Sequence, residues 1–311
     1  MTENAETIRI LWYFLIYSCM GWGLEVAYHA VTLGKVVNRG FLNGPVCPVY
    51  GFGVLAILSF FGRIEEAVGS GSGIILFFSG MLVTTAIELL AGWSLDRLFH
   101  ARWWDYSNHP FHFHGYICLE FSLYWGLGTV FVYRIVHPTV RLLAAFLTAF
   151  RFELLLLILL YLVLITDVCV TAATVRGLNS RLEELDELRR KLRIVSDSMS
   201  GQIAENAIRT KQRLDEGAEM TRVLVEEKKE QARQLKEEKQ KEAAQLLEEL
   251  QARYEEVRRK LYANQSFGAG RIARAFPHAV HAHYNELLKE FREKLESKED
   301  GGDGAKTHRK G

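Results

Sequence analysis

The stretch ELLAGWSLDRLFHARWWDYSNHPFHFHGYICLE, residues 88–120, begins and ends inside apolar runs and carries much of the chain's polar chemistry between them. It contains Arg97, Arg102, two aspartates, a Trp-Trp pair and four histidines. Each apolar flank also holds one acid, Glu88 on one side and Glu120 on the other. A polar connection clamped between two apolar walls that each carry a carboxylate indicates the mouth of a site rather than a passive link.

The chain divides into two parts of unlike composition. Residues 8–175 hold nearly all the aromatic and aliphatic content, whereas residues 176–311 are dominated by Glu, Lys, Arg, Gln and Ala. This contrast predicts a transmembrane domain at 1–175, a charged helical or coiled-coil region at 176–262 and a final region at 263–311. The net charge of +1, with acids and bases interleaved, argues against a nucleic-acid partner. The four cysteines lack paired spacing, which predicts free thiols.

Five apolar runs are candidates to cross a lipid bilayer, since about 20 residues at about 1.5 Å each match a hydrocarbon core of about 30 Å. The runs are Ile10–Leu33, Tyr50–Phe61, Gly73–Trp93, Tyr116–Val136 and Phe152–Val175. The second run is short, and its alternative is a re-entrant segment. Residues 137–151 are too short and too basic to cross, which predicts a helix at the membrane interface. The predicted fold is therefore an all-α, polytopic membrane bundle of about five transmembrane helices, followed by a long charged helical tail.

The tail carries signals for orientation and for association. The cluster of basic residues from Arg176 to Lys191 predicts, by the positive-inside rule, that the tail and the connections after the first and third runs are cytoplasmic in a cell-membrane protein. Leucines at helical spacing predict helices that could self-associate. Residues 196–201 and Gly217 are predicted breaks. Residues 264–277 are a predicted hinge, residues 278–295 a short amphipathic helix, and residues 301–311 a loose, disordered end.

Four acids inside the apolar runs share one half of the predicted bilayer. Counted from the ends of their runs, they lie roughly 6 to 14 Å from the face that carries the connections. A charge at such depth costs about 2.5 to 3.5 kcal/mol, so it normally faces a bundle interior or water and finds a partner. We expect a polar vestibule that opens toward the cytoplasm; the alternative is a set of ordinary hydrogen-bonding groups between helices. The acids are Glu25, Glu88, Glu120 and Asp167, and the other expected vestibule residues are Arg39, Arg102 and Asp105.

The histidines of the connection are weak candidates for a metal site. In an extended HPFHFH segment, His112 and His114 would point to the same side, with His109 nearby. Their spacing matches no strong metal pattern, so packing and hydrogen bonding are the favoured interpretation and no cofactor is expected. The chain also has no P-loop sequence, so we do not expect it to hydrolyse ATP itself.

Several separated motifs resemble those of a known family. FLIYSCMGWGLEV (14–26), NRGFLNGPVCPVYGFG (38–53), ARWWDYS (101–107) and GYICLEFSLYWGL (115–127), together with the helix of Glu88, resemble the bacterial multi-pass membrane family labelled type IV ABC-transporter permeases, over residues of about 8–140. The family pattern falls on Gly21, Trp22, Glu25, Asn38, Arg39, Gly40, Gly44, Pro45, Pro48, Tyr50, Gly51, Glu88, Trp103, Trp104, Asp105, Tyr106, Gly115, Cys118, Leu119, Glu120, Trp125 and Gly126. The resemblance implies a transport subunit in the lipid bilayer with a separate ATPase; it gives no substrate and does not cover the tail.

Three functions remain open on the sequence. The favoured one is a permease-like membrane subunit, not an enzyme, with an acid-lined vestibule. The second is a membrane-anchored scaffold or signalling protein that acts through residues 178–262. The third is an intramembrane enzyme that uses a carboxylate or a histidine as a base, although no nucleophile or metal motif accompanies the acids.

Overall fold

The computed structural model describes residues 2–34, 36, 38–68, 73–215, 222–263 and 268–307. These residues are almost entirely helical, which confirms the predicted all-α class. Two compact units are distinguished along the chain: Met1–Gly177 together with Gln265–Gly311, and Leu178–Asn264. The final region, predicted as separate, is thus grouped with the transmembrane part. The predicted break at Gly217 lies outside the described residues.

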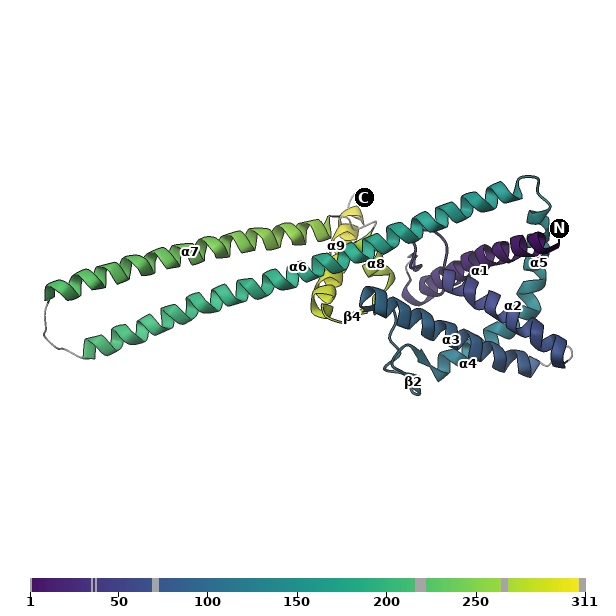
Figure 1. Cartoon of the computed structure of the whole chain (residues 1–311), viewed down its shortest axis with the longest axis horizontal. Helices are drawn as coiled ribbons and strands as arrows, with labels where there is room; N and C mark the ends of the chain where they lie inside the picture. Colours follow the sequence, from purple (N-terminus) through teal and green to yellow (C-terminus); the bar gives the residue numbers. More distant parts are fainter. Residues whose placement is uncertain are drawn as a thin grey trace. The chain divides into compact units, whose positions relative to one another are not determined.

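The helices of the first unit form an apolar bundle (Figure 1). They are α1 (Thr2–Leu33), α2 (Pro48–Val68), α3 (Gly73–Phe99), α4 (Leu119–Phe131), the π-helical turn η1 (Val132–Val136), α5 (His137–Thr148) and the first part of α6 (Glu153–Asp215). Among the described residues, four helical segments are long and apolar enough to cross a membrane: Ala5–Val31, Gly73–Phe99, Leu119–Thr148 and Glu153–Gly201. The apolar part of α2, Pro48–Phe61, is shorter, so its crossing stays a prediction.

The segment predicted as a separate interfacial helix, residues 137–151, is instead the continuation of the fourth apolar helix. The backbone passes from α4 through η1 into α5 without a break. Pro138 lies in the first turn of α5, where the wider π turn before it accommodates the missing N–H. Val140 and Ala144 are buried, and Ala144 packs with Trp12 of α1 and with neighbouring apolar side chains. This packing gives α5 a place in the bundle that its charge pattern did not reveal.

Glycines set the distance between neighbouring helices of the bundle. A methyl group placed on Gly21 of α1 would lie 2.2 Å from Cγ of Tyr50 on α2. Between α3 and α4, a methyl group placed on Gly80 would lie 2.3 Å from Cγ2 of Thr129. Such contacts allow close backbone approach, which is the usual basis of helix association in lipid.

Among the described residues, four short strands and two further helices complete the first unit. Three of the strands belong to the connection between α3 and α4; the other connection discussed below joins α1 to α2. Within the α3–α4 connection, β2 (His112–Phe113) pairs antiparallel with β3 (Ile117–Cys118). β1 (Ala101–Arg102) pairs antiparallel with β4 (Val280–His281), which follows α8 (Ala269–Ala275) and precedes α9 (Asn285–Thr307). The predicted hinge at 264–277 therefore contains a helix, because Ile272 and its small neighbours bury an apolar face. The predicted loose end at 301–311 is helical as far as Thr307.

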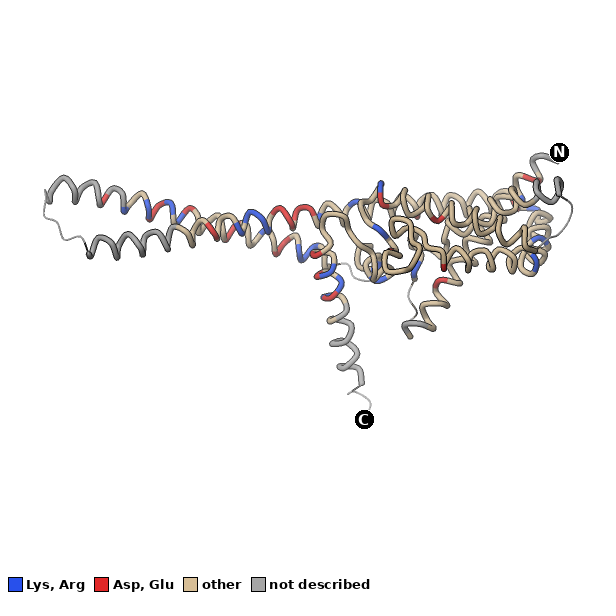
Figure 2. The backbone as a smooth tube through the Cα atoms, turned by 90° about the horizontal axis from the view of Figure 1, so that it is seen from below, with Lys and Arg blue, Asp and Glu red and all other residues tan. Residues whose placement is uncertain are grey.

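The second unit is an antiparallel helical hairpin. Its two helices are the distal part of α6 and the whole of α7 (Arg222–Tyr262). Arg253 of α7 forms an ion pair with Glu184 of α6 at 2.9 Å. Acidic and basic residues alternate along its described part, whereas the bundle is largely uncharged (Figure 2). Its buried apolar residues are Leu178, Leu182, Leu185, Leu188, Val257 and Leu261.

The break predicted at residues 196–201 does not occur, because α6 continues to Asp215. Serine and aspartate cost a helix only a few tenths of a kcal/mol each, and a single interior glycine about 1 kcal/mol. Helix-favouring residues on both sides outweigh these costs.

The continuity of α4 and α5 predicts the sidedness of two exposed positions. In a background without the four native cysteines, we expect a thiol at Asn108 to be shielded from an impermeant maleimide in intact cells and a thiol at Ala149 to react. The reason is that Leu119–Thr148 is long and apolar enough to cross a membrane, and one such crossing would place the two positions on opposite sides. Permeabilised cells should label both. Equal labelling in intact cells would rule out the single crossing, and the reverse order would overturn the predicted orientation.

The contact of Gly21 with Tyr50 predicts an unequal response of two glycines on α1. Gly21→Ala forces the Tyr50 ring to move, and overpacking of this kind costs about 1 to 3 kcal/mol. Gly23→Ala is the matched control, because a methyl group there meets nothing within 4 Å. Thermal unfolding in detergent should show a lowered Tm for Gly21→Ala only. Equal Tm values for both variants would contradict the packing.

Candidate functional site

Among the acids of the apolar helices whose burial the structure describes, Glu88 is the most buried, with 8% of its surface exposed. It lies on α3 and accepts hydrogen bonds from two side chains on other segments. The hydroxyl of Tyr106, in the α3–α4 connection, donates to Oε1 at 3.1 Å, and Nε1 of Trp125, on α4, donates to Oε2 at 3.2 Å. No Lys, Arg or His among the described residues forms an ion pair with Glu88. Both oxygens are therefore satisfied by uncharged donors.

Glu25 of α1 is joined to the same group of side chains. Its Oε1 accepts a hydrogen bond from the hydroxyl of Tyr50 at 2.6 Å, and its Oε2 lies 3.9 Å from a guanidinium nitrogen of Arg39. The Tyr50 ring contacts the Trp125 ring edge to face, with 5.7 Å between centroids. We call Glu25, Tyr50, Trp125, Glu88 and Tyr106 the carboxylate network.

Tyr106 is held as a donor to Glu88 by its surroundings. Its ring stacks on Phe121 with 4.6 Å between centroids, and the ring of His109 meets it edge to face at 5.8 Å. Burial, followed by the nearby charge of Glu88, raises the pKa of Tyr106 above the ordinary phenol value. The phenol therefore keeps its proton at neutral pH and can donate it in the hydrogen bond to Glu88.

Asp167 of α6 belongs to a second cluster, which fixes the α1–α2 connection. Its Oδ1 accepts from the backbone N–H and the side-chain amide of Asn43, at 3.0 and 2.9 Å, and from Thr171 at 3.2 Å. Its Oδ2 accepts from the backbone N–H of Gly44 at 2.7 Å. A carboxylate saturated by donors from one connection acts as an anchor for that connection.

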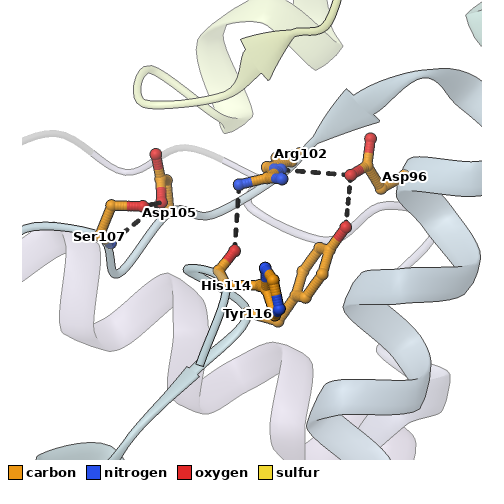
Figure 3. Close-up of polar contacts among 6 residues, drawn as sticks. All are labelled: Asp96, Arg102, Asp105, Ser107, His114 and Tyr116. Carbon is orange, nitrogen blue, oxygen red and sulfur yellow. Dashed lines mark hydrogen bonds and ion pairs between the residues drawn. The ribbon is translucent and has the colours of Figure 1, made fainter. Parts of the chain in front are cut away.

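Arg102 belongs to a third cluster, within the α3–α4 connection (Figure 3). Its Nε lies 3.2 Å from Oδ2 of Asp96, and another guanidinium nitrogen donates to the carbonyl of His114 at 3.1 Å. The hydroxyl of Tyr116 donates to the same Asp96 oxygen at 2.6 Å, and this hydrogen bond raises the pKa of Tyr116. The guanidinium also lies over the Tyr116 ring, 4.9 Å from its centroid. Arg102 therefore ties the end of α3 to the β2–β3 turn.

Asp105 closes a tight turn rather than facing the carboxylate network. Its Oδ1 accepts from the backbone N–H and the hydroxyl of Ser107, at 3.0 and 2.5 Å (Figure 3). Gly115 packs directly against this carboxylate, since a methyl group placed on it would lie 2.3 Å from Oδ1 of Asp105. Its backbone φ of +75° is also in the left-handed region. Only glycine suits a position with both constraints.

Glu120 and the histidines form no metal site in the described part of the chain. Glu120 is 46% exposed, and its Oε2 lies 3.1 Å from Nδ1 of His109. The extended backbone that would place His112 and His114 on the same side does not form, because His114 has φ of +50° at the turn between β2 and β3. Among the described residues, no group of three His, Cys, Asp or Glu side chains could hold a metal ion.

The four acids predicted from the sequence have one structural feature in common. Each bonds to a residue of one of the two connections: Glu25 to Arg39, Asp167 to Asn43, Glu88 to Tyr106 and Glu120 to His109. All four therefore lie toward the end of the bundle that carries the connections. Of the predicted site residues, Glu25, Glu88 and Arg39 are brought together, and Glu120 adjoins them through His109, whose ring meets Tyr106. Asp167, and Arg102 with Asp105, belong to separate clusters.

Three members of the carboxylate network, Tyr50, Tyr106 and Trp125, were not predicted as site residues. None of them is ionisable near neutral pH, so counting charges within apolar runs could not find them. Their signal was positional, since all three lie in the family-like motifs quoted above, at VYGFG, ARWWDYS and LYWGL. Aromatic side chains that donate a hydrogen bond inside an apolar run are the partners that a buried acid needs.

Comparison with known proteins supports a family assignment. A family described as "Putative ABC-transporter type IV" matches residues 12–172, which is more than half of the chain. No curated protein and no solved structure matches the chain. The matched residues contain all five members of the carboxylate network and both connections. The chain therefore belongs to the type IV ABC-transporter family that this match describes.

Proposed function

We propose that this chain is the membrane-embedded permease subunit of an ABC transporter, with a carboxylate-lined vestibule that opens toward the two connections on the cytoplasmic side. The family match supports a transporter component. The single observation that carries the transport role is Glu88, a buried acid inside an apolar helix that has only uncharged donors among its described partners. Intramembrane acids of this kind are costly and commonly mark a substrate or ion pathway.

The arrangement of the carboxylate network suggests how it would work. Glu88 is contacted from α4 by Trp125 and from the α3–α4 connection by Tyr106, and Trp125 also contacts Tyr50. A movement of α4 relative to α3 would therefore break the Trp125 bond and expose a carboxyl oxygen. In the open form, that oxygen could accept a proton, a cation or a hydrogen-bond donor of a solute.

A separate ATPase would supply the energy in this proposal. The sequence has no P-loop with which to bind nucleotide phosphates. The two connections are the natural place for an ATPase to act, because each of them is bonded to an intramembrane acid. A displaced connection would thus change the environment of a carboxylate directly.

Neutralisation of Glu88 tests the transport role. Vesicles from cells that overproduce the protein would be supplied with ATP and a metabolite extract, and the accumulated solutes compared by mass spectrometry. We expect Glu88→Gln to lose at least about tenfold in the accumulation that depends on the protein, because a neutral amide can neither take up a proton nor pair with a cation as a carboxylate does. Membrane content should stay equal.

The matched control is Glu286→Gln, which removes an exposed acid on α9. It should accumulate the same solutes as the unmodified protein. Wild-type accumulation in Glu88→Gln would remove Glu88 from the pathway. A solute profile that does not depend on the amount of protein would reject the permease proposal itself.

The helical hairpin favours a second candidate function, a membrane-anchored scaffold. Residues 178–264 form a compact unit with a buried leucine row and the Glu184–Arg253 ion pair. The family match ends at residue 172, so nothing in it accounts for this unit. Such a hairpin could recruit a partner or a second copy of the chain.

Deletion of the hairpin separates the two functions. Residues 178–264 can be replaced by a flexible linker of about six residues, which spans roughly 13 Å. This is feasible because Gly268 lies beside Thr174 of α6, with 3.7 Å between a methyl group placed on Gly268 and Cγ2 of Thr174. We expect solute accumulation to persist in the deletion variant. Its loss, with the protein still in the membrane, would favour the scaffold.

A further inference from the structure

We propose that residues 268–295 form a strap that closes over both connections and can detach while the bundle stays folded. The strap consists of α8, β4 and the first part of α9. It lies outside the residues that the family match covers. Its contacts with the bundle, its internal bonds and the cost of closing it each support the inference.

The first contact is an exchange of arginines with the α1–α2 connection. Arg271 of α8 donates to the backbone carbonyls of Gly40 at 2.9 Å and Phe41 at 2.8 Å. In the opposite direction, Nε of Arg39 donates to the carbonyl of Ala275 at 3.1 Å. Each partner thus places a guanidinium on the backbone of the other, which fixes the strap in one position.

The second contact is with the α3–α4 connection and α6. β4 adds to β1, with Ala101 opposite His281 and Arg102 opposite Val280, and the backbone N–H of Ala282 donates to the carbonyl of His100 at 2.9 Å. The apolar part of this contact includes the edge-to-face pair of Trp103 and Phe276, with centroids 4.9 Å apart. Its buried core is Phe99, Trp103, Val175 and Ile272. The strap therefore holds the two connections at fixed positions relative to each other.

Internal bonds give the strap a shape of its own. Nδ1 of His281 accepts from the backbone N–H groups of His283 and Tyr284, at 3.2 and 3.1 Å. Arg292 of α9 donates to the carbonyls of Pro277 and Ala279. The buried face of α9, with Leu287, Leu288, Phe291 and Leu295, turns toward the strap's own α8 and β4. These bonds allow the segment to move as one piece.

The closed position carries a cost that favours reversible docking. Three buried donors at this contact have no hydrogen-bond partner within the described structure: Nε1 of Trp103, Nε of Arg271 and Nε2 of His281. A buried donor without a partner loses its hydration and gains nothing in return. Opening would return all three donors to water, so the docking bonds are offset by a penalty that only the closed state bears.

Detachment would act on the carboxylate network through Arg39. This residue bonds Ala275 of the strap with one nitrogen and lies 3.9 Å from Glu25 with another. When the strap leaves, Arg39 loses its strap partner and becomes free to change its pairing with Glu25. This regulatory meaning rests on the proposed function, whereas the detachment itself does not.

Thiol accessibility in the full-length chain tests the detachment. Single reporter cysteines would replace Ala101 on the connection, Ala273 on the strap and Ala144 in the bundle core, all of them buried, in a background without the native cysteines. We expect Arg271→Ala to raise the maleimide reaction rates at Ala101 and Ala273 about tenfold, because two charged hydrogen bonds hold the strap closed. The rate at Ala144 should stay the same.

Two further variants keep the result interpretable. Lys289→Ala, at an exposed position on α9, is the control and should change none of the three rates. Phe276→Ala removes only the ring against Trp103 and should raise the same two rates by a smaller factor. Equal increases at all three positions, or none at Ala101 and Ala273 in either variant, would overturn the strap. No transport assay is involved, so this result and that of Glu88→Gln fail independently.

Discussion

Carboxylates inside apolar helices require hydrogen-bond donors, and this requirement determines the structure at the end of the bundle where the α1–α2 and α3–α4 connections lie. In an apolar helix an acid has no water to solvate it, so another segment must bring a donor to it. For Glu88 that segment is the α3–α4 connection, which supplies Tyr106, and for Asp167 it is the α1–α2 connection, which supplies Asn43. The acids consequently hold the connections in place, and the connections supply the hydrogen-bond donors that the acids need. A substitution in either the acid or its donor would therefore leave the other without its partner.

Sequence reasoning found the helices and the side of the bundle on which the acids lie, because composition and the count of residues from each run end are local properties. It could not find which acids meet. Glu25 and Glu88 are joined only through Tyr50 and Trp125, and that juxtaposition depends on how α1, α2, α3 and α4 pack. Glu120 also lies in an apolar run beside the same connection, yet it bonds the half-buried His109 and is itself 46% exposed.

Two of the errors have a common physical origin, which is that long-range packing overrode a local signal. The short, basic segment at 137–151 indicated a separate interfacial helix, but Ala144 is buried against α1 and the segment continues the line of α4. The glycines near residue 270 indicated a hinge, but Arg271 and Ile272 are buried against the two connections. In each case a partner more than 100 residues away decides the local structure.

The first unit is discontinuous in the chain, and this sets an order on its biosynthesis. Residues 1–177 leave the ribosome first, and the segment from Gln265 follows only after the hairpin. At a synthesis rate of about 5 to 20 residues per second, the roughly 90 intervening residues delay its arrival by about 4 to 18 seconds. During that interval the backbone carbonyls of Gly40 and Phe41 have not met Arg271. A newly made bundle therefore passes through an unstrapped stage, in which the two connections are accessible before the chain's own C-terminal segment arrives.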